Sequence, residues 1–561
     1  MSLYPTHSRL HKVLVHAPLA AACLCALAAP PRALAAGPSI TVDATAGVHA
    51  ISDDIYGMNF APEALAQELA LPVRRWGGNG TSRYNWQIDT SNTGSDWFFE
   101  NIPNPPPVGR TLPDGSAADQ FVEQDRRTGT RTILTLPMTG WVAKRRPPGD
   151  THPYDCGFRV SAYGAQQQVD PWDTNCGNGV RPDGSLVTGN DPQDTSAASD
   201  PAFVQAWLRH LIGNYGSAAV GGVAYYDLDN EPELWSSTHR DVRPQHLGYD
   251  ELASRTEQYA SALKAVDAGA QTLGPSSWGW TAYFYSDLDT APGGDWWNDP
   301  EDREAHGGTP LAEWYLQQMR AWEQQHGQRI LDYVDEHYYP QANGVYAGAT
   351  DPATDALRLR STRSLWDPGY VDESWIAQPV QLIPMMRGWV AADYPGTKIA
   401  ISEYNWGALG DISGALAQAD VLGIFGREGV DLATLWGPPA ATDPGAFAFR
   451  MYRNVDGKGG RFGDTAVQAT SADQGRLAVY AARRSAGGAL TVMAVNKSGS
   501  KLTSTVTLDH FTAGASAKAW RYGAANLAAI QHLKDVPVSG NAFTASLPAN
   551  SITLYVVPAA K

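Results

Sequence analysis

The chain has 561 residues, of which 43% are hydrophobic and 18% are charged, so it can bury a large core and wholesale disorder is excluded. The 58 acidic residues outnumber the 42 Lys and Arg, giving a net charge of -16, which argues against binding to nucleic acid or to an anionic membrane. The 19 Trp and 24 Tyr, against 13 Phe, favour ligands with flat apolar faces edged by hydrogen-bonding groups, such as sugar rings.

The first 35 residues are typical of a secretory signal peptide. Arg9 and Lys12 precede the apolar run 13–29, and the small-x-small site Ala33-Leu34-Ala35 follows it. We therefore expect cleavage after Ala35 and a secreted protein, either extracellular or periplasmic. The alternative, a membrane anchor, would need a longer uninterrupted apolar run.

The mature chain keeps two cysteines, Cys156 and Cys176. An even pair in an exported chain predicts a disulfide, here within a Gly-, Asp- and Pro-rich loop over residues 150–200. No CxxC or HxxxH spacing accompanies the pair, which argues against zinc. In the same loop Asp191, Asp194 and Asp200 offer hard oxygen ligands, so we predict a structural calcium site there, and no cofactor for catalysis.

Short apolar or β-branched runs alternate with helix-period segments between residues 55 and 464, which is the pattern of successive βα units. The helical segments include 201–215, 249–267 and 311–327. Eight such units predict an α/β fold, a closed (β/α)8 TIM-like barrel whose active site lies at the carboxyl ends of its strands. The eight predicted strands are Ile55–Phe60, Pro72–Trp76, Arg131–Leu136, Val223–Asp229, Gln271–Pro275, Tyr333–Tyr338, Lys398–Glu403 and Asp431–Trp436.

The pattern changes after residue 464. Helical periodicity fades, and short alternating runs separated by Gly, Ser and Asn turns predict an appended all-β sandwich over residues 465–561. The alternating stretch within residues 36–54 is expected to complete this domain, so that both ends of the mature chain meet in it.

Two glutamates follow or close predicted barrel strands. Glu231 lies in an Asn-Glu-Pro triplet after the fourth strand, and Glu403 closes the seventh. The barrel would bring them to the same face, and hydrolysis of a glycosidic bond needs such a pair. A separation of about 5–5.5 Å gives a nucleophile and an acid/base with retention, whereas about 6.5–9.5 Å leaves room for water and gives inversion. The alternative is chance, because a chain with 58 acids places some at strand ends.

Several long motifs carry a resemblance to a known family. The chain resembles glycoside hydrolase family 44 from about residue 38 to its C-terminus, in the segments RRWGGNGTSRYNW (74–86), DLDNEPELWSSTHR (227–240), DEHYYP (335–340), ISEYNWG (401–407) and MYRNVDGKGGRFGDT (451–465). These are secreted endo-β-1,4-glucanases, many active on xyloglucan. The resemblance implies a retaining mechanism on a plant cell-wall polysaccharide, with Glu231 matching the acid/base and Glu403 the nucleophile.

Residues near the two glutamates have chemistry that suits these roles. Arg75, at the end of the second strand, is placed to keep Glu403 ionised, and Tyr338 or Tyr339 to hold its carboxylate. Glu231 must keep its proton near neutral pH, so its surroundings should raise its pKa. The alternative for Arg75 is a purely structural ion pair.

Further candidates would contact the sugar. Asn230 is placed to bond the 2-hydroxyl, an interaction that strengthens in the transition state. His337 is placed to reach the sugar or the acid, its alternative being a buried, hydrogen-bonded histidine, and Asn79, which begins a glycosylation sequon, is also a predicted substrate contact.

Aromatic residues gather at the same strand ends. A row of such rings in an open cleft would bind successive sugars, and each ring would contribute on the order of 1 kcal/mol. Binding of several sugars would place cleavage inside a chain. We expect half of them to be core residues. Trp76, Trp406 and Trp436 are the predicted platforms, the last two because each follows a strand end. The full set is Trp76, Trp86, Trp141, Trp235, Trp278, Trp280, Trp406 and Trp436.

The sequence therefore predicts a monomeric, secreted endo-acting hydrolase of β-1,4-glucosidic bonds in cellulose-type β-glucans or xyloglucan, working by double displacement. A xylanase or mannanase on the same barrel is one alternative. The other is a non-catalytic polysaccharide-binding protein, which should have lost one of the two carboxylates.

Overall fold

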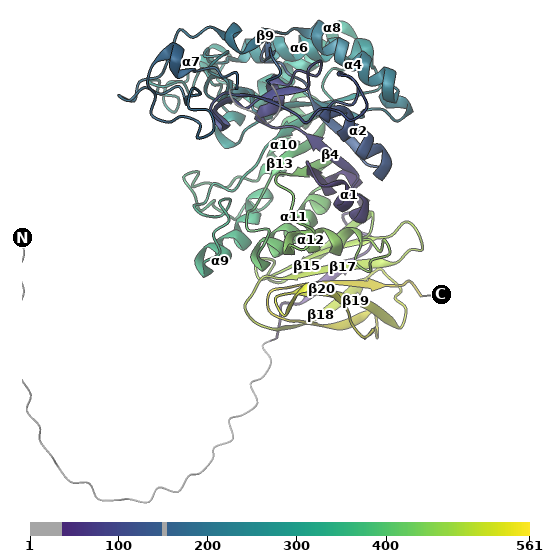
Figure 1. The fold of residues 1–561 in the computed structure, drawn as a ribbon. Helices are drawn as coiled ribbons and strands as arrows, with labels where there is room; N and C mark the ends of the chain where they lie inside the picture. The colour runs from purple at the N-terminus through teal and green to yellow at the C-terminus, as the bar shows by residue number, and fades with distance from the viewer. Residues whose placement is uncertain (1–35, 148–153, 561) are drawn as a thin grey trace, which may run out of the picture.

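The computed structural model describes residues 36–147 and 154–560. The predicted signal peptide lies outside the described residues. The chain folds into a closed barrel and a β-sheet domain, and Figure 1 shows the two stacked, with helices α11 and α12 between them. No helix in residues 36–147 or 154–560 combines the length and apolar character that a bilayer span requires.

Eight parallel strands close the barrel, so the predicted TIM-like α/β fold is confirmed. Each strand lies within two residues of its predicted bounds, and the first and the fourth are shortened most. The first begins later because Ser52 accepts a hydrogen bond from the Asp54 amide and starts the 3-10 turn η1 (Asp53–Tyr56). The fourth ends at Asp227 because Asp229 turns into left-handed backbone, with φ 71°. The strands, in order around the barrel, are β3 (Gly57–Asn59), β4 (Val73–Trp76), β7 (Arg131–Thr135), β10 (Tyr225–Asp227), β11 (Gln271–Ser277), β12 (Tyr333–Glu336), β13 (Lys398–Tyr404) and β14 (Leu432–Leu435).

Helices follow most of these strands and cover the barrel. The helix at 201–215 illustrates why they form where they do, since Asp200 accepts a hydrogen bond from the Phe203 amide, Pro201 takes the first helical position and Gly216 follows the last turn. The helices are α1 (Glu63–Leu69), α2 (Ala117–Thr128), α3 (Val160–Tyr163), α4 (Pro201–Tyr215), α5 (Trp235–Thr238), α6 (Tyr249–Val266), α7 (Glu301–Ala305), α8 (Leu311–His326), α9 (Pro352–Ser361), α10 (Leu382–Asp393), α11 (Ile412–Glu428) and α12 (Pro444–Arg453).

One layer of buried side chains fills the barrel toward the amino ends of its strands, with one residue from each of seven strands: Val73, Ile133, Tyr225, Leu273, Tyr333, Ala400 and Leu432. Side chains two positions further along a strand point the same way. On β4 and β10 these are Arg75 and Asp227. The apolar layer is therefore the floor on which the polar residues of the barrel mouth are placed.

The second domain is the predicted all-β unit, but its strands form one continuous mixed sheet that curls so that its two halves share an apolar core. The N-terminal strand β1 lies inside this sheet, antiparallel to β15 and parallel to β18. The strands are β1 (Ile40–Asp43), β2 (His49–Ala50), β15 (Thr465–Ser471), β16 (Leu477–Arg483), β17 (Leu490–Asn496), β18 (Leu502–Asp509), β19 (Ser516–Gly523), β20 (Asn526–His532), β21 (Val536–Pro537), β22 (Ala542–Leu547) and β23 (Ser551–Val557).

The predicted disulfide between Cys156 and Cys176 is present and closes part of the long loop before α4. Phe99, Phe158 and Val187 form a small apolar cluster of their own in this region. Two short antiparallel strand pairs lie here, β5 (Thr90–Asn92) with β6 (Asn101–Pro103) and β8 (Trp141–Ala143) with β9 (Ser196–Ala198). The described part of this loop therefore adds defined structure to the barrel mouth.

A buried ionic contact joins the two domains. Asp420 of α11 accepts hydrogen bonds from Tyr480 (2.6 Å), Thr362 (2.7 Å) and the ammonium group of Lys497 (2.9 Å). The side chains of Asp420 and Lys497 are 2% and 3% exposed. Because both charges are removed from water, each depends on the other.

We expect Asp420→Ala to destabilise the protein by about 3–5 kcal/mol, because it leaves the Lys497 charge buried without its partner. Circular dichroism during thermal and urea unfolding measures the change. The control is Glu373→Ala, which removes an ion pair with Arg360 whose side chains are 37% and 42% exposed, and which should cost about 1 kcal/mol or less. Equal effects of the two substitutions would contradict the interpretation.

Candidate active site

Two carboxylates meet at the carboxyl ends of the barrel strands. Glu403 is the sixth residue of β13, and Glu231 follows β10 in left-handed backbone, with φ 45°. The Glu231 amide donates to the carbonyl oxygen of Ser276 on β11, which holds this turn. One carboxylate oxygen of each glutamate and a ring nitrogen of His337 all lie within 4.8 Å of one another. The fold thus brings together the two acids that the strand-end pattern selected.

The Glu403 carboxylate is surrounded by groups that favour its ionised form. Arg75 donates to one oxygen at 2.6 Å, Tyr339 donates to the other at 2.8 Å, and His337 Nδ1 lies 3.6 Å away. Burial alone would raise the pKa of Glu403, but the positive charges of His337 and Arg75 and the two hydrogen bonds together lower it. Glu403 is therefore suited to attack as a carboxylate.

Arg75 is fully buried and ties the site together. Besides Glu403, its guanidinium donates to Asp227, to Asn59 Oδ1 at 3.2 Å and to Asn230 Oδ1 at 2.9 Å. Asn59 is held in turn by donating to the carbonyl oxygens of the seventh and eighth strands. Arg75 is thus both an ion-pair partner and the residue that sets the orientation of its neighbours.

Glu231 has the opposite environment. Burial raises the pKa of Glu231 and the nearby Glu403 carboxylate adds to this, while the hydrogen bond with His337, at 3.0 Å, only partly offsets both. Although burial opposes a charged imidazole, Glu403 and Glu231 raise the pKa of His337 to about 9. Its other nitrogen lies 3.1 Å from Ser402 Oγ, which donates to Asp335 at 2.5 Å. Glu231 is thus suited to carry a proton, and His337 to hold it in place.

Asn230 is the next residue in this network. Its side-chain nitrogen Nδ2 donates to Asn79 Oδ1 at 3.0 Å, and the side-chain Nδ2 of Asn79 donates to the Asp96 carboxylate at 3.1 Å. Asn79 therefore orients Asn230 and connects it to the loop at Asp96. Sequence reasoning missed Asp96, which lies in a loop turn (η3, Gly94–Asp96) with no strand pattern to mark it.

Known proteins resemble this chain in sequence. The family model for glycoside hydrolase family 44 matches residues 90–342. Endoglucanase A of Paenibacillus lautus is 31% identical over 540 residues, which cover 92% of this chain and 72% of the relative.

Two solved structures resemble this one over 93% of the chain. A family 44 xyloglucanase from Paenibacillus polymyxa is 30% identical with a TM-score of 0.77, over 93% of this chain and 100% of that one. CelM2, a bifunctional glucanase-xylanase from a metagenome library, is 44% identical with a TM-score of 0.89, over 93% of this chain and 99% of that one.

The chain belongs to glycoside hydrolase family 44. It is therefore an enzyme that hydrolyses glycosidic bonds, as the resemblance in its motifs predicted. That both carboxylates are present and adjoining also counts against the alternative of a non-catalytic binding protein.

Aromatic rings flank the site of this family 44 hydrolase. Trp76 and Trp436 are partly exposed, and both contact Phe60, at centroid distances of 5.5 and 6.1 Å. The Trp436 ring lies so close to Gly78 that a Cβ there would come within 2.5 Å of it. Phe60, 40% exposed, follows β3 directly and was missed, although its position matches that of Trp436 after β14.

Two predicted substrate contacts are wrong. Trp406 is 1% exposed and its Nε1 donates to Ser361, and Tyr338, 2% exposed, packs on Trp406 at 5.6 Å. Both side chains point into the apolar layer between strands and helices, so neither offers a face to a sugar. Four of the eight singled-out tryptophans are buried, as expected for half of them: Trp86, Trp235, Trp280 and Trp406.

Tyr346 is a further residue that the sequence did not indicate. Its ring packs on Tyr339 at 4.6 Å and it is 49% exposed. It lies on the loop after β12, where no periodicity identifies which side chain turns toward the site. Its contact with the tyrosine that holds Glu403 places an exposed ring beside the carboxylates.

The three predicted calcium ligands do not come together. Asp191 accepts from the Gln193 amide, Asp194 pairs with Tyr163 and Arg159 at 3.0 Å, and Asp200 begins α4. Each carboxylate thus has its own local partner, and calcium binding stays a prediction.

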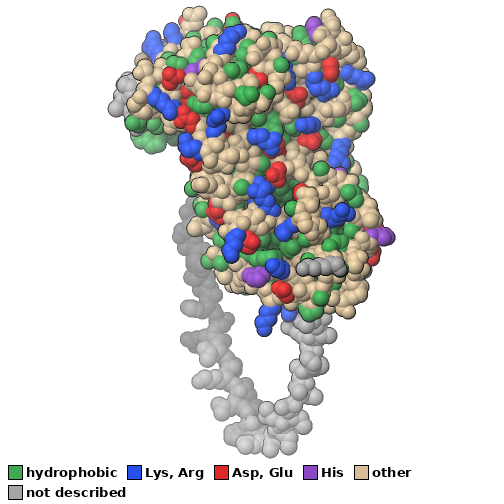
Figure 2. Space-filling view, turned by 90° about the vertical axis from the view of Figure 1, so that its right-hand side faces the viewer, with side chains coloured by type: hydrophobic (Ala, Val, Ile, Leu, Met, Phe, Trp, Pro, Cys, Tyr) green, Lys and Arg blue, Asp and Glu red, His purple; other side chains and the backbone are tan. Residues whose placement is uncertain are grey.

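Lysine, arginine, aspartate and glutamate side chains are intermixed over the face in Figure 2.

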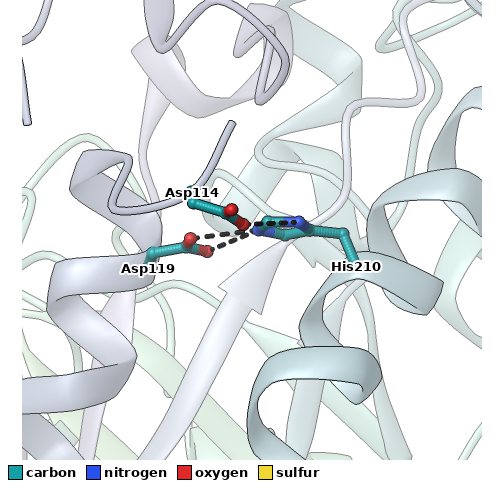
Figure 3. Close-up of side chains that lie close together, drawn as sticks. All are labelled: Asp114, Asp119 and His210. Carbon is teal, nitrogen blue, oxygen red and sulfur yellow. Dashed lines mark hydrogen bonds and ion pairs between the residues drawn. The ribbon is translucent and has the colours of Figure 1, made fainter. Parts of the chain in front are cut away.

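Among the described residues two groups have the composition of a metal site. In Figure 3, His210 of α4 faces Asp119 of α2, with Nε2 3.0 Å from both carboxylate oxygens, and Asp114 lies beside them. These are hydrogen-bond distances, so the group ties α2 to α4. The other group is Glu231, His337 and Glu403, where a cation would meet the Arg75 guanidinium and a histidine that already favours its charged form.

We expect Tyr339→Phe to shift the acidic limb of the kcat/KM profile to higher pH. The substitution removes a hydrogen bond that favours the Glu403 carboxylate, so the pKa of Glu403 rises and a larger fraction is protonated at acidic pH. On the acidic limb kcat/KM should therefore fall below that of the wild type, because less of the enzyme carries an ionised nucleophile. Tyr346→Phe is the control, and an acidic limb that stays in place in Tyr339→Phe would disprove the role.

Proposed function

We propose that this family 44 hydrolase is a secreted, retaining endo-β-1,4-glucanase that acts on cellulose-type β-glucans and xyloglucan. The observation that carries the proposal is the approach of Glu231 and Glu403, whose carboxylate oxygens lie within 4.8 Å. Retaining enzymes hold their two carboxyl groups about 5–5.5 Å apart, whereas inverting enzymes need about 6.5–9.5 Å for an intervening water. The close approach supports the retaining geometry.

In the first step the Glu403 carboxylate attacks C1 of the sugar, and Glu231 gives its proton to the departing glycosidic oxygen. This forms a glycosyl ester on Glu403. The partners of Glu403 support its role, since Arg75 and Tyr339 hold both oxygens and keep the group ionised. Glu231, whose pKa burial and Glu403 raise, supplies the proton.

In the second step Glu231 acts as a base. When Glu403 becomes an ester it loses the negative charge that helps to raise the pKa of Glu231, so Glu231 becomes a better carboxylate at the moment a base is needed. It takes a proton from water, the water oxygen attacks C1, and Glu403 leaves as a carboxylate. His337 stays within 3.0 Å of Glu231 and keeps it oriented toward the same bond.

The substrate class rests on the aromatic surfaces and on the relatives. Trp436, which packs on Gly78, and Tyr346, which packs on Tyr339, offer exposed ring surface near the carboxylates, which supports binding of several sugars and cleavage within a chain. One relative is named an endoglucanase, and the Paenibacillus polymyxa xyloglucanase has been solved with xyloglucan. Xylan is a second candidate, because CelM2, at 44% identity, is a glucanase-xylanase.

Initial rates on carboxymethylcellulose, xyloglucan, xylan and mannan test the substrate proposal. We expect the two glucans to be cleaved fastest, with early release of mixed oligosaccharides and a fast fall in viscosity. Higher rates on xylan or mannan would replace the proposed substrate, and binding without any fragments would refute the activity.

We expect the first product to keep the β configuration, because two carboxyl groups this close leave no room for an attacking water between Glu403 and C1. Proton NMR of the anomeric signal during the first minutes of hydrolysis measures this before the sugar mutarotates. An initial α product would overturn the retaining mechanism.

We expect external azide to distinguish the two carboxylates. Glu403→Ala should lose activity by several orders of magnitude and regain part of it with azide, which then attacks from the side of the lost carboxylate and gives an α-glycosyl azide. Glu231→Ala should keep faster cleavage of activated aryl glycosides than of cello-oligosaccharides and give the β-azide. The opposite pairing of products would exchange the two roles.

A further inference from the structure

A cavity of about 580 Å³ lies between the barrel and the β-sheet domain. Ligand pockets in proteins commonly measure about 300–1,000 Å³, so this interdomain cavity has the size of a ligand site. It is lined by α1 and α12 of the barrel, by the loop 454–458 that follows α12, and by the strands β19 and β20 of the second domain. Both domains therefore contribute to it.

The interdomain cavity lies on the opposite side of the barrel from Glu231 and Glu403. Helices that follow parallel barrel strands run back toward the amino ends of those strands, and the cavity is lined at the ends of α1 and α12. Arg453, the last residue of α12, donates to the carbonyl oxygen of Ala70, just after α1, and to Asp53 in the turn before β3. A ligand in this cavity would therefore not occupy the catalytic cleft.

One wall of the cavity carries an aromatic ring in a fixed orientation. Trp520 of β19 stacks on His532 of β20, with ring centroids 4.9 Å apart and an interplanar angle of 28°. Trp520 remains partly exposed, while Phe447 and Ile530 of the same lining pack with it against the large apolar core. A ring that is already oriented loses little conformational freedom when a ligand packs on it. Trp520 is thus a preformed apolar surface for a flat ligand.

The charges in the lining are balanced. Arg450 donates to both carboxylate oxygens of Glu68, at 2.6 and 2.9 Å. Asp456 accepts from the backbone amides of Lys458 and Gly460. The two carboxylates of the lining thus offset its two cationic side chains, so the cavity has no excess charge with which to select an ionic ligand. This balance favours a neutral ligand.

Two polar side chains of the lining remain available to a ligand. Within residues 36–147 and 154–560, neither the Lys458 ammonium group nor the His532 imidazole has a hydrogen-bonding partner. An ammonium group donates, and a neutral imidazole both donates and accepts, so the two can bond hydroxyl groups. A flat ring edged by such groups matches a sugar, which presents apolar faces and hydroxyl edges.

We propose that this interdomain cavity is a second, non-catalytic binding site for the β-glucan chain on which the enzyme acts. A polymer held there stays close to the protein, so another stretch of the same chain meets the cleft at a raised effective concentration. The choice of a β-glucan rests on the proposed function, whereas the choice of a neutral polysaccharide rests on the lining itself.

Trp520→Ala tests the site in the full-length chain. It is combined with Glu403→Gln, so that the polysaccharide is not cleaved, and affinity is measured from the retardation of the protein in native gels that contain xyloglucan or hydroxyethylcellulose. We expect Trp520→Ala to weaken the affinity about fivefold, the loss of one stacking contact. The matched control is Leu527→Ala, since Leu527 lies on β20, is 42% exposed and is outside the lining, and its affinity should stay within about twofold.

His532→Ala is the second variant, and it keeps the test independent of folding because His532 is exposed. It should weaken the same affinity about twofold or more, because it removes both the ring under Trp520 and a hydrogen-bonding group. In the active enzyme, Trp520→Ala should lower kcat/KM on xyloglucan and leave kcat/KM on an aryl cellotrioside within about twofold of the wild type. Unchanged retardation in His532→Ala and Trp520→Ala, or an equal fall on both substrates, would overturn the site.

Gels that contain xylan separate this proposal from the proposed function. Weaker retardation of Trp520→Ala in the glucan gels supports the site, whereas a change in the xylan gels alone would overturn the β-glucan as its ligand. A wild type that cleaves no β-glucan refutes the proposed function, but the retardation is measured on the inactive Glu403→Gln background and still decides the interdomain cavity.

Discussion

The buried guanidinium of Arg75 is the contact on which the site depends. It bonds Asn59 of β3, Glu403 of β13, Asp227 of β10 and Asn230 in the turn after β10, so its partners come from three other barrel strands. A buried cation is stable only when its donors are matched, so these partners are fixed in position by the cost of leaving it unpaired. Through Asn230 and Asn79 the same constraint reaches the loop at Asp96, outside the barrel.

Arg75 and His337 are placed unequally around the two glutamates, whose pKa values are therefore shifted in opposite directions. Arg75 touches Glu403 and not Glu231, whereas His337 is closer to Glu231, at 3.0 Å, than to Glu403, at 3.6 Å. Two carboxyl groups this close cannot both ionise easily, so the group with the guanidinium takes the charge and the other keeps the proton. In the proposed mechanism, His337, Arg75 and Tyr339 together therefore favour Glu403 as the nucleophile and leave Glu231 as the proton donor.

Strand periodicity explains what the sequence predicted correctly and where it failed. The barrel and the two glutamates followed from runs that end at one face, a rule independent of side-chain detail. Tyr338 was wrong because alternation was not applied past the strand end, where His337 and Tyr339 share one face. Alternation would not have excluded Trp406, because the register of β13 against β14 shifts between Ile401 and Tyr404, and counting from Ala400 of the inner layer would place Trp406 inside. Asp96 and Tyr346 lie on loops, where no period exists to be used.

The turn after β10 joins Glu231 to a cavity of about 780 Å³ that is lined mainly by the loops after β10 and β11. Asp229 and Glu231 both adopt left-handed backbone, which is costly for residues with a Cβ and persists only when surrounding contacts hold it. Here the Asp229 carboxylate accepts from the amides of Met138 and Asn230, and the Glu231 amide donates to Ser276. This turn aims the Glu231 side chain at Glu403 and, because Pro232 begins η6 (Pro232–Leu234) at once, sends Glu233 into the wall of the neighbouring cavity. The position of Glu231 and that of Glu233 in the cavity wall are therefore consequences of one backbone conformation.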